Sequence, residues 1–140
     1  MDQGERAVID IVTALIRNER GHVLLVRKRG TDSFMQPGGK REAGEDDRAA
    51  LAREVREELG CALVPDSVLP LGIFEAAAAN EPGQWVRASA YAALISGDVT
   101  CRAEIAEYAW VDPSEPGEKK LAPLTRDTIL PLALLLAHQS

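Results

Sequence analysis

Three glutamates at helical spacing are the residues of this chain whose types and positions point most directly to chemistry. Glu54, Glu57 and Glu58 stand at i, i+3 and i+4 within a helical run from about residue 47 to 59, so their carboxylates would share one helix face. Carboxylates that close repel one another unless a cation lies in front of them. Mg²⁺ prefers oxygen ligands and is often held by a few carboxylates together with the phosphates of a substrate. The spacing therefore predicts a metal site suited to a phosphorylated ligand.

A glycine turn directly precedes this run. Gly38 and Gly39 follow Pro37, and Gly60 stands just past the last helical residue, as at many helix ends. Glycine has no side chain to block an approach, so the turn can bring a backbone carbonyl close to the same ion. The alternative is a solvated, charged helix face after a turn, which is the common meaning of a glutamate-rich helix.

The spacing of residues 38–61 favours the metal site. Gly39, five residues, Glu45, seven residues and then the run REVREELG from 53 to 60 resemble the signature of the Nudix hydrolase family. The last constrained position departs from the family, because Cys61 stands where Val, Ile or Leu is preferred. A buried cysteine behaves as a small apolar residue, so we expect little consequence.

The resemblance implies a fold, a reaction and a role for each residue of the signature. The fold would be α/β: a Nudix-like α/β/α sandwich with a mixed β-sheet. The family cleaves a nucleoside diphosphate linked to another group, usually by attack of water on phosphorus, with Mg²⁺ or Mn²⁺ neutralising phosphate charge. Glu45 would brace the helix and Arg53 would orient a glutamate. The metal ligands would be Gly38 through its carbonyl, Glu54, Glu57 and Glu58.

The general base varies within the family and stays open here. Glu104 lies six residues before Trp110, in a segment similar to the late loop of MutT-type members, where a glutamate reaches the metals. Glu107 is its competitor, and the alternative is that both are exposed loop carboxylates. The expected catalytic residues are Glu54, Glu57, Glu104 and Arg53.

Basic residues close to the glycine turn are candidates for phosphate binding. Arg27, Lys28 and Arg29 follow the second apolar run, and we expect at least one of them to contact a phosphate rather than only solvent. VLLVRKR resembles the MutT-type strand whose arginine meets the nucleotide, and the matching residue is Arg27. The expected substrate contacts are Arg27, Arg29, Gly39 and Lys40.

Marks of particular Nudix subfamilies are largely missing. Gln36 stands directly before Pro37, where many members carry a large apolar residue, which argues against a MutT-like base pocket. By elimination we expect a nucleoside triphosphate pyrophosphohydrolase that gives a nucleoside monophosphate and pyrophosphate. The alternatives are a sugar-nucleotide hydrolase and a ligand-sensing Nudix domain without catalysis. A relative of isopentenyl-diphosphate isomerase is disfavoured, because Cys61 is wrongly placed for that chemistry.

Length and charge narrow the class of protein. The 140 residues predict one domain, 1–140, and the net charge of −6 argues against a nucleic-acid partner. The first residues are polar, which does not fit a secretion signal, and the apolar run 132–137 is too short to span a membrane. We therefore expect a cytoplasmic protein. The expected partner is a small nucleotide. A homodimer through the apolar C-terminal helix or the N-terminal strand stays open.

The remaining patterns predict the elements that hold the signature. Apolar runs 7–16 and 21–26 around an Asn/Gly turn predict a β-hairpin. Runs 71–79 and 85–95, separated by the turn 80–83, predict two more strands, and 108–111 a short one. Residues 124–138 predict a terminal helix that Pro131 kinks or divides. Leu51, Val55 and Leu59 would form the buried stripe of the signature helix.

Overall fold

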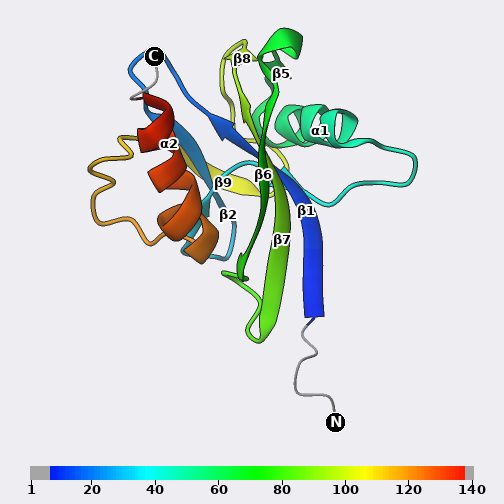
Figure 1. Cartoon of the computed structure of the whole chain (residues 1–140), viewed down its shortest axis with the longest axis vertical. Helices are drawn as coiled ribbons and strands as arrows, with labels where there is room; N and C mark the ends of the chain where they lie inside the picture. Colours follow the sequence, from blue (N-terminus) through cyan, green and yellow to red (C-terminus); the bar gives the residue numbers. More distant parts are fainter. Residues whose placement is uncertain (1–6, 138–140) are drawn as a thin grey trace.

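A computed structural model describes residues 7–137 of the chain as a mixed β-structure between two helices (Figure 1). One sheet has the strand order β4-β1-β7-β6, a second has the order β3-β2-β9, and β5 pairs with β8. The elements are β1 (Ala7–Ile16), β2 (Val23–Lys28), β3 (Phe34–Met35), β4 (Gly38–Gly39), α1 (Asp47–Leu59), β5 (Ala62–Leu63), a 3₁₀ turn (Pro65–Ser67), β6 (Leu69–Ala77), β7 (Gln84–Ala93), β8 (Ile95–Ser96), β9 (Ile105–Val111), a π-helical turn (Thr125–Ile129) and α2 (Leu130–Ala137).

Helix α1 has the bounds that the sequence predicts. The side chain of Asp46 accepts a hydrogen bond from the Ala49 N–H at 2.8 Å and so caps the first turn. Gly60 ends the helix in the left-handed conformation. Leu51, Val55 and Leu59 are fully buried along one face. The predicted stripe is confirmed, and it fixes which face of α1 remains for the glutamates.

Two apolar clusters separate the layers. The first joins the stripe of α1 to alternate residues of β1 and β2, including Val12, Ala14 and Val26. The second joins the other faces of these strands, through residues such as Leu15 and Leu25, to the C-terminal helical segment. With helices packed on both faces of the strands, the predicted α/β/α sandwich with a mixed sheet is confirmed.

The predicted hairpin of residues 7–16 and 21–26 is wrong. The turn forms, because the Asn18 N–H donates to the carbonyl of His22 at 3.1 Å, but only the bridge between Arg17 and Val23 links the two strands. Beyond that bridge β1 pairs in parallel with β7 and antiparallel with β4, whereas β2 pairs with β3 and β9. Residues 12–16 of β1 and 23–26 of β2 are buried, and there strands far along the chain take the place of the local partner.

The C-terminal helix differs from the prediction in its first turns. The predicted interruption lies before Pro131, where the Leu130 N–H donates to the carbonyl of Thr125 and closes a π-helical turn. Pro131 then sits in the first turn of α2, where its missing N–H is tolerated. The predicted end at His138 lies outside the described residues. No helix among residues 7–137 is long and apolar enough to cross a membrane.

An arginine ties the loop before α1 to the main sheet. Arg41 Nε lies 2.6 Å from Asp47 Oδ1, and its two terminal nitrogens contact Ser89 Oγ at 3.0 Å and Asp10 Oδ1 at 3.3 Å. Tyr91 donates to the second oxygen of Asp47. These bonds lower the pKa of Asp47, chiefly through the hydrogen bond from Arg41. Helix α1 is thereby held in a fixed position beside β1 and β7.

Candidate active site

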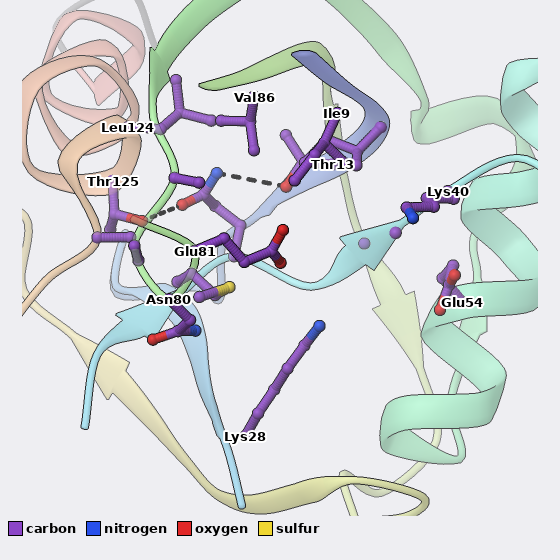
Figure 2. Close-up of a pocket in the computed structure, with 18 of the residues that line it drawn as sticks. Ile9, Thr13, Lys28, Lys40, Glu54, Asn80, Glu81, Val86, Leu124 and Thr125 are labelled. Carbon is purple, nitrogen blue, oxygen red and sulfur yellow. Dashed lines mark hydrogen bonds between the residues drawn. The ribbon is translucent and has the colours of Figure 1, made fainter. Parts of the chain in front are cut away.

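A cavity of about 360 Å³ lies between the two helical layers and has two chemically different ends (Figure 2). Glutamates of α1, Glu104 and two lysines line the charged end, whereas mainly aliphatic side chains and Gln36 line the other, next to Asn80 and Glu81 of the loop between β6 and β7. The charged end consists of Lys28, Lys40, Glu54, Glu58 and Glu104. The apolar end includes Ile9, Ile11, Met35, Val86 and Leu124 around Gln36 and Thr125. This division suits a ligand with a charged part and a flat or apolar part.

The glycine turn forms the wall between α1 and β1. Strand β4 pairs Gly38 with Thr13 and Gly39 with Val12. A Cβ on Gly38 would lie 2.1 Å from the carbonyl oxygen of Val12, and one on Gly39 would lie 2.2 Å from Glu54 Oε2. The absence of a side chain at Gly38 therefore lets the turn pair closely with β1, and its absence at Gly39 lets Glu54 of α1 lie against the turn.

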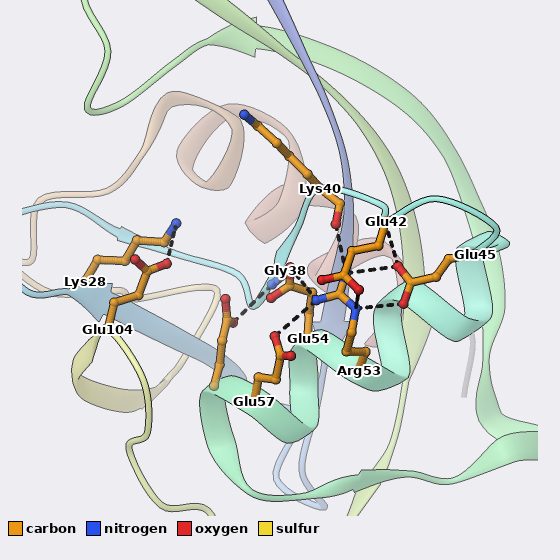
Figure 3. A network of polar contacts seen from close by, with 10 residues as sticks. Lys28, Gly38, Lys40, Glu42, Glu45, Arg53, Glu54, Glu57 and Glu104 are labelled. Atoms are coloured by element: carbon orange, nitrogen blue, oxygen red, sulfur yellow. Dashed lines mark hydrogen bonds and ion pairs between the residues drawn. The ribbon is translucent and has the colours of Figure 1, made fainter.

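Arg53 is the centre of the polar network on α1 (Figure 3). Its Nε and Nη2 donate to the two oxygens of Glu45 at 2.7 and 3.0 Å, and Nη2 also donates to the carbonyl of Lys40 at 2.9 Å. Its Nη1 lies 3.3 Å from Glu54 Oε2 and 3.1 Å from Glu57 Oε1. The Arg53 hydrogen bonds are the main reason why the pKa of Glu45 is lowered. Arg53 thus connects the turn to two of the glutamates.

Glu58 is the most deeply buried acid of the site. Only 4% of the residue is exposed, and its Oε1 accepts one hydrogen bond, from the Gly38 N–H at 3.3 Å. Burial, and next the charge of Glu54, raise the pKa of Glu58 to about 8. Burial also raises the pKa of Glu54, against the opposing charge of Arg53. Glu58, buried with one N–H partner and with Glu54 beside it, is a place where a cation would be stabilised.

The expected metal ligands are only partly together. Glu54, Glu58 and Gly38 line the cavity, whereas the carboxylate of Glu57 is exposed and paired with Arg53. Within residues 7–137 no three Asp, Glu, His or Cys side chains are grouped closely enough to hold a metal ion. The residues nonetheless lie on one face of α1 beside the glycine turn, as the spacing predicts.

Of the three basic residues at the end of β2, only Lys28 lines the cavity. Arg27 lies opposite Glu107 on β9 and donates to its Oε2 at 2.8 Å, and also to the carbonyl of Thr31 at 2.7 Å. Arg29 is exposed outside the cavity. Successive side chains of a strand point to opposite faces, which separates Lys28 from Arg27. The expected contacts Gly39 and Lys40 both line the cavity.

The two candidate bases after β8 have different surroundings. Glu104 lines the cavity, and its Oε1 lies 3.3 Å from Lys28 Nζ. The segment before Glu104 is anchored to α1, because the Arg102 N–H donates to the carbonyl of Glu58 at 2.9 Å. Glu107 lies outside the cavity lining and is paired with Arg27. The geometry therefore favours Glu104 over Glu107 for contact with a ligand.

Three residues at the apolar end form a buried chain of hydrogen bonds. Thr125 donates to Gln36 Oε1, and Gln36 Nε2 donates to Thr13 Oγ1 at 3.3 Å. Thr13 in turn donates to the carbonyl of Pro37 at 3.0 Å. Sequence reasoning noticed Gln36 only as a departure from the family and did not single out Thr13 or Thr125, since no local pattern connects residues 13, 36 and 125.

Cys61 at the end of the signature is buried, with 2% exposed, in the first apolar cluster. The prediction that it replaces an aliphatic residue without consequence for packing agrees with this position.

The family model of the NUDIX domain matches residues 9–132. This chain belongs to the Nudix family. Its similarity to the nucleoside triphosphatase NudI of Escherichia fergusonii is 28% identity over 130 residues, covering 85% of this chain and 92% of that protein. The crystal structure of a MutT protein from Methanosarcina mazei Go1 has a TM-score of 0.71 at 28% identity, covering 95% of this chain and 97% of that one.

Another relative of this Nudix chain is similar over a shorter stretch. The 8-oxo-dGTP diphosphatase of Haemophilus influenzae is 38% identical over 60 residues, which cover 40% of this chain and 44% of the relative. The chain thus matches less than half of that relative's length. The shared segment supports membership of the family.

Proposed function

We propose that this Nudix protein hydrolyses a phosphoric anhydride bond of a nucleoside diphosphate linked to another group, with a nucleoside triphosphate as substrate and a nucleoside monophosphate and pyrophosphate as products. The observation that carries the proposal is the two-ended cavity, in which Glu54 and the buried Glu58 of the Nudix signature meet an apolar space. The names of two relatives, a nucleoside triphosphatase and an 8-oxo-dGTP diphosphatase, support this substrate class.

The acids of the site fit the divalent metal that Nudix hydrolases generally need. Glu58 is buried beside Glu54 with a single N–H partner, so its carboxylate is short of positive charge. Mg²⁺ or Mn²⁺ would be held by Glu54 and Glu58, with Glu57 and the Gly38 carbonyl as further oxygen donors. When bound, the metal would neutralise phosphate charge and lower the pKa of a bound water.

The protein's own residues would orient the substrate and the acids. Lys28 and Lys40 line the charged end and can bind phosphate oxygens. Arg53 keeps Glu54 and Glu57 in place from outside the cavity. Glu104 lies at the cavity with Lys28 as its partner and is the base candidate from the late loop, beside Glu54 and Glu57 on α1.

The test is product release from a panel of nucleoside triphosphates, oxidised nucleotides, sugar nucleotides and dinucleotides with Mg²⁺ or Mn²⁺. We expect Glu57→Gln to lower turnover at least about a hundredfold, because it removes a charged metal ligand. Glu118→Gln, in the exposed loop 112–120, is the matched control and should keep wild-type turnover. Near-normal turnover of Glu57→Gln at saturating Mg²⁺ would remove Glu57 from the site.

The competing function is a ligand sensor. No product release from any nucleotide of the panel, together with a nucleotide-dependent rise in melting temperature, would favour that alternative. Turnover of the sugar nucleotides alone would keep the hydrolase and change its substrate.

A further inference from the structure

We propose that Gln36 reads the edge of the nucleobase, and that Thr13 and Thr125 hold its amide in one orientation. The inference rests on the proposed function, since it places the base of the substrate at the apolar end of the cavity. The amide is 6% exposed and the two threonine residues are 2% and 0% exposed, yet all three line the cavity. Figure 2 shows the two hydrogen bonds of this amide, which accepts one from the Thr125 hydroxyl and donates the other to Thr13 Oγ1.

The bonds fix which end of the amide is which. Thr13 has a single hydroxyl proton and gives it to the carbonyl of Pro37. Its oxygen can then only accept, so it must face the NH₂ group of Gln36 and not the carbonyl. At the other end the Thr125 hydroxyl donates to the amide oxygen. An exchange of the two amide ends would place the amide oxygen against the Thr13 oxygen, which has no proton left.

The fixed amide keeps hydrogen-bonding capacity for a ligand. An amide NH₂ carries two protons and the carbonyl oxygen two lone pairs, and each threonine uses one of them. One N–H and one lone pair remain, side by side. This is the pattern with which glutamine reads adjacent donor and acceptor atoms on the edge of a base, as it reads adenine in nucleic acids.

This amide is buried and fixed, whereas the other polar side chains near this end, Asn80 and Glu81, belong to the loop between β6 and β7. The walls of this end are aliphatic, formed by residues such as Ile9, Met35 and Leu124, and none of the described residues that line the cavity is aromatic. Aliphatic walls contact every base about equally well, because apolar contacts do not depend on hydrogen-bonding groups. A buried amide that is left without a hydrogen-bond partner, in contrast, lowers the affinity. A base whose edge lacks one hydrogen-bonding group should therefore be rejected.

The experiment compares matched nucleotides that differ in one exocyclic amino group: ATP with the triphosphate of purine riboside, and CTP with the triphosphate of zebularine. For wild-type protein we expect the kcat/KM ratio within at least one pair to be about tenfold or more. Gln36→Met keeps the size of the side chain and should reduce this ratio to within about threefold, mainly through KM. A ratio near one in the wild type, or an unchanged ratio in Gln36→Met, would overturn the proposal.

Thr125 is tested as a positioning residue. Thr125→Val should lower the ratio at least about threefold, because the amide loses one of its two anchors. Thr128→Val, one turn along and outside the cavity lining, should leave it unchanged. The double variant Gln36→Met, Thr125→Val should have the same kcat/KM ratio as Gln36→Met alone. It removes both partners of the hydrogen bond between Thr125 and Gln36, so no buried polar group of that bond is left unpaired and the effect on folding is limited. A further loss in the double variant would mean that Thr125 does not act through Gln36.

Binding separates this inference from the proposed function. The α,β-methylene analogues of the same nucleotides are titrated in the presence of Mg²⁺, because the α–β linkage that the proposed reaction breaks cannot be hydrolysed in them. Base-selective binding that depends on Gln36, without turnover of any nucleotide, keeps the inference and overturns the hydrolase. Turnover without a Gln36-dependent ratio does the reverse.

Discussion

The guanidinium of Arg53 and the carboxylate of Glu45 face each other with two parallel bonds, of 2.7 and 3.0 Å, between α1 and the turn before it. The pair spans eight residues, and both side chains are 17% exposed. Because the same guanidinium contacts Glu54 and Glu57, the position of the turn and the position of the acids depend on one residue.

Arg53→Lys should therefore impair turnover more than folding. A lysine keeps the charge but cannot bind Glu45 with two bonds while also reaching Glu57. We expect a fall in Mg²⁺-dependent kcat of about tenfold to a hundredfold, as for residues that orient metal ligands. The measurement is steady-state kinetics beside far-UV circular dichroism. Arg126→Lys, whose ion pair with Asp127 is exposed, is the control, and an equal loss in both variants would contradict the orienting role.

Glu58 should make the metal-free protein less stable as the pH rises. Its folded pKa of about 8 lies above the ordinary value of 4.5, so between these values the unfolded chain has lost a proton that the folded protein keeps. The contribution of Glu58 to the free energy of unfolding is therefore greatest below pH 4.5 and falls until about pH 8, by at most about 1.4 kcal/mol per pH unit. Urea unfolding in EDTA at several pH values measures this slope, and Glu58→Gln should flatten it. The same slope in both proteins would rule out the raised pKa.

Mg²⁺ should reverse this pH dependence. A carboxylate must lose its proton to bind a metal, so Mg²⁺ binding to Glu58 competes with protonation and strengthens as the pH passes through about 8. We expect the rise in melting temperature on adding Mg²⁺ to be larger at pH 8.5 than at pH 6.0. Glu58→Gln should show a smaller rise with little pH dependence. A rise that is equal at both pH values in the wild type would place the metal away from Glu58.

Gly39→Ala should disturb the acids with little effect on the backbone. The new Cβ would lie 2.2 Å from Glu54 Oε2, at the far end of a flexible side chain that can move aside. We expect turnover to fall at least about tenfold, since the displaced carboxylate is an expected metal ligand. Gly30→Ala is the control, and it should lower stability without lowering turnover. Gly30 has φ +79° and open space around it, so alanine there should lose about 1 kcal/mol of stability and keep full turnover.

Lys28 and Arg27 give a direct test of which side chain meets the substrate. Lys28→Gln should raise KM at least about fivefold, because it removes a cation from the cavity lining. Arg27→Gln should change KM less than about twofold, because Arg27 is bound to Glu107 and to a loop carbonyl outside the cavity. Michaelis constants for the best substrate of the panel decide between them. The reverse order of effects would support the expectation from the sequence that Arg27 contacts the substrate.

The parts of this molecule that sequence could predict are those with local causes. Helix α1 was predictable because its cap, its buried stripe and its terminal glycine all lie within residues 46–60. Its glutamates follow from the same spacing. The hairpin failed because the alternation of apolar residues does not say which strand lies alongside, and β1 has its partners at β4 and β7.

Which basic residue of β2 lies at the cavity depends on one residue of register, and the structure places Lys28 there while the sequence predicted Arg27. Adjacent residues of β2 point to opposite faces, so choosing Arg27 in place of Lys28 reverses the face. The chain of Thr13, Gln36 and Thr125 joins β1, the glycine turn and the C-terminal helical segment, and only the assembled fold brings them together. Nothing in the spacing of these residues could have indicated it.

The parallel pairing of β1 with β7 determines when in folding the cavity can exist. Every residue of β1 lies beside the residue 77 positions later, from Ala7 with Gln84 to Ile16 with Ala93. Contacts so distant along the chain form late, because the closure of a long loop opposes them. Ile9 and Val86 are such a pair, and both line the apolar end of the cavity. The helix with the acids can form early from local signals, whereas the space for a base appears only when both ends of the chain are in place, so nucleotide binding during refolding would report completion of the fold.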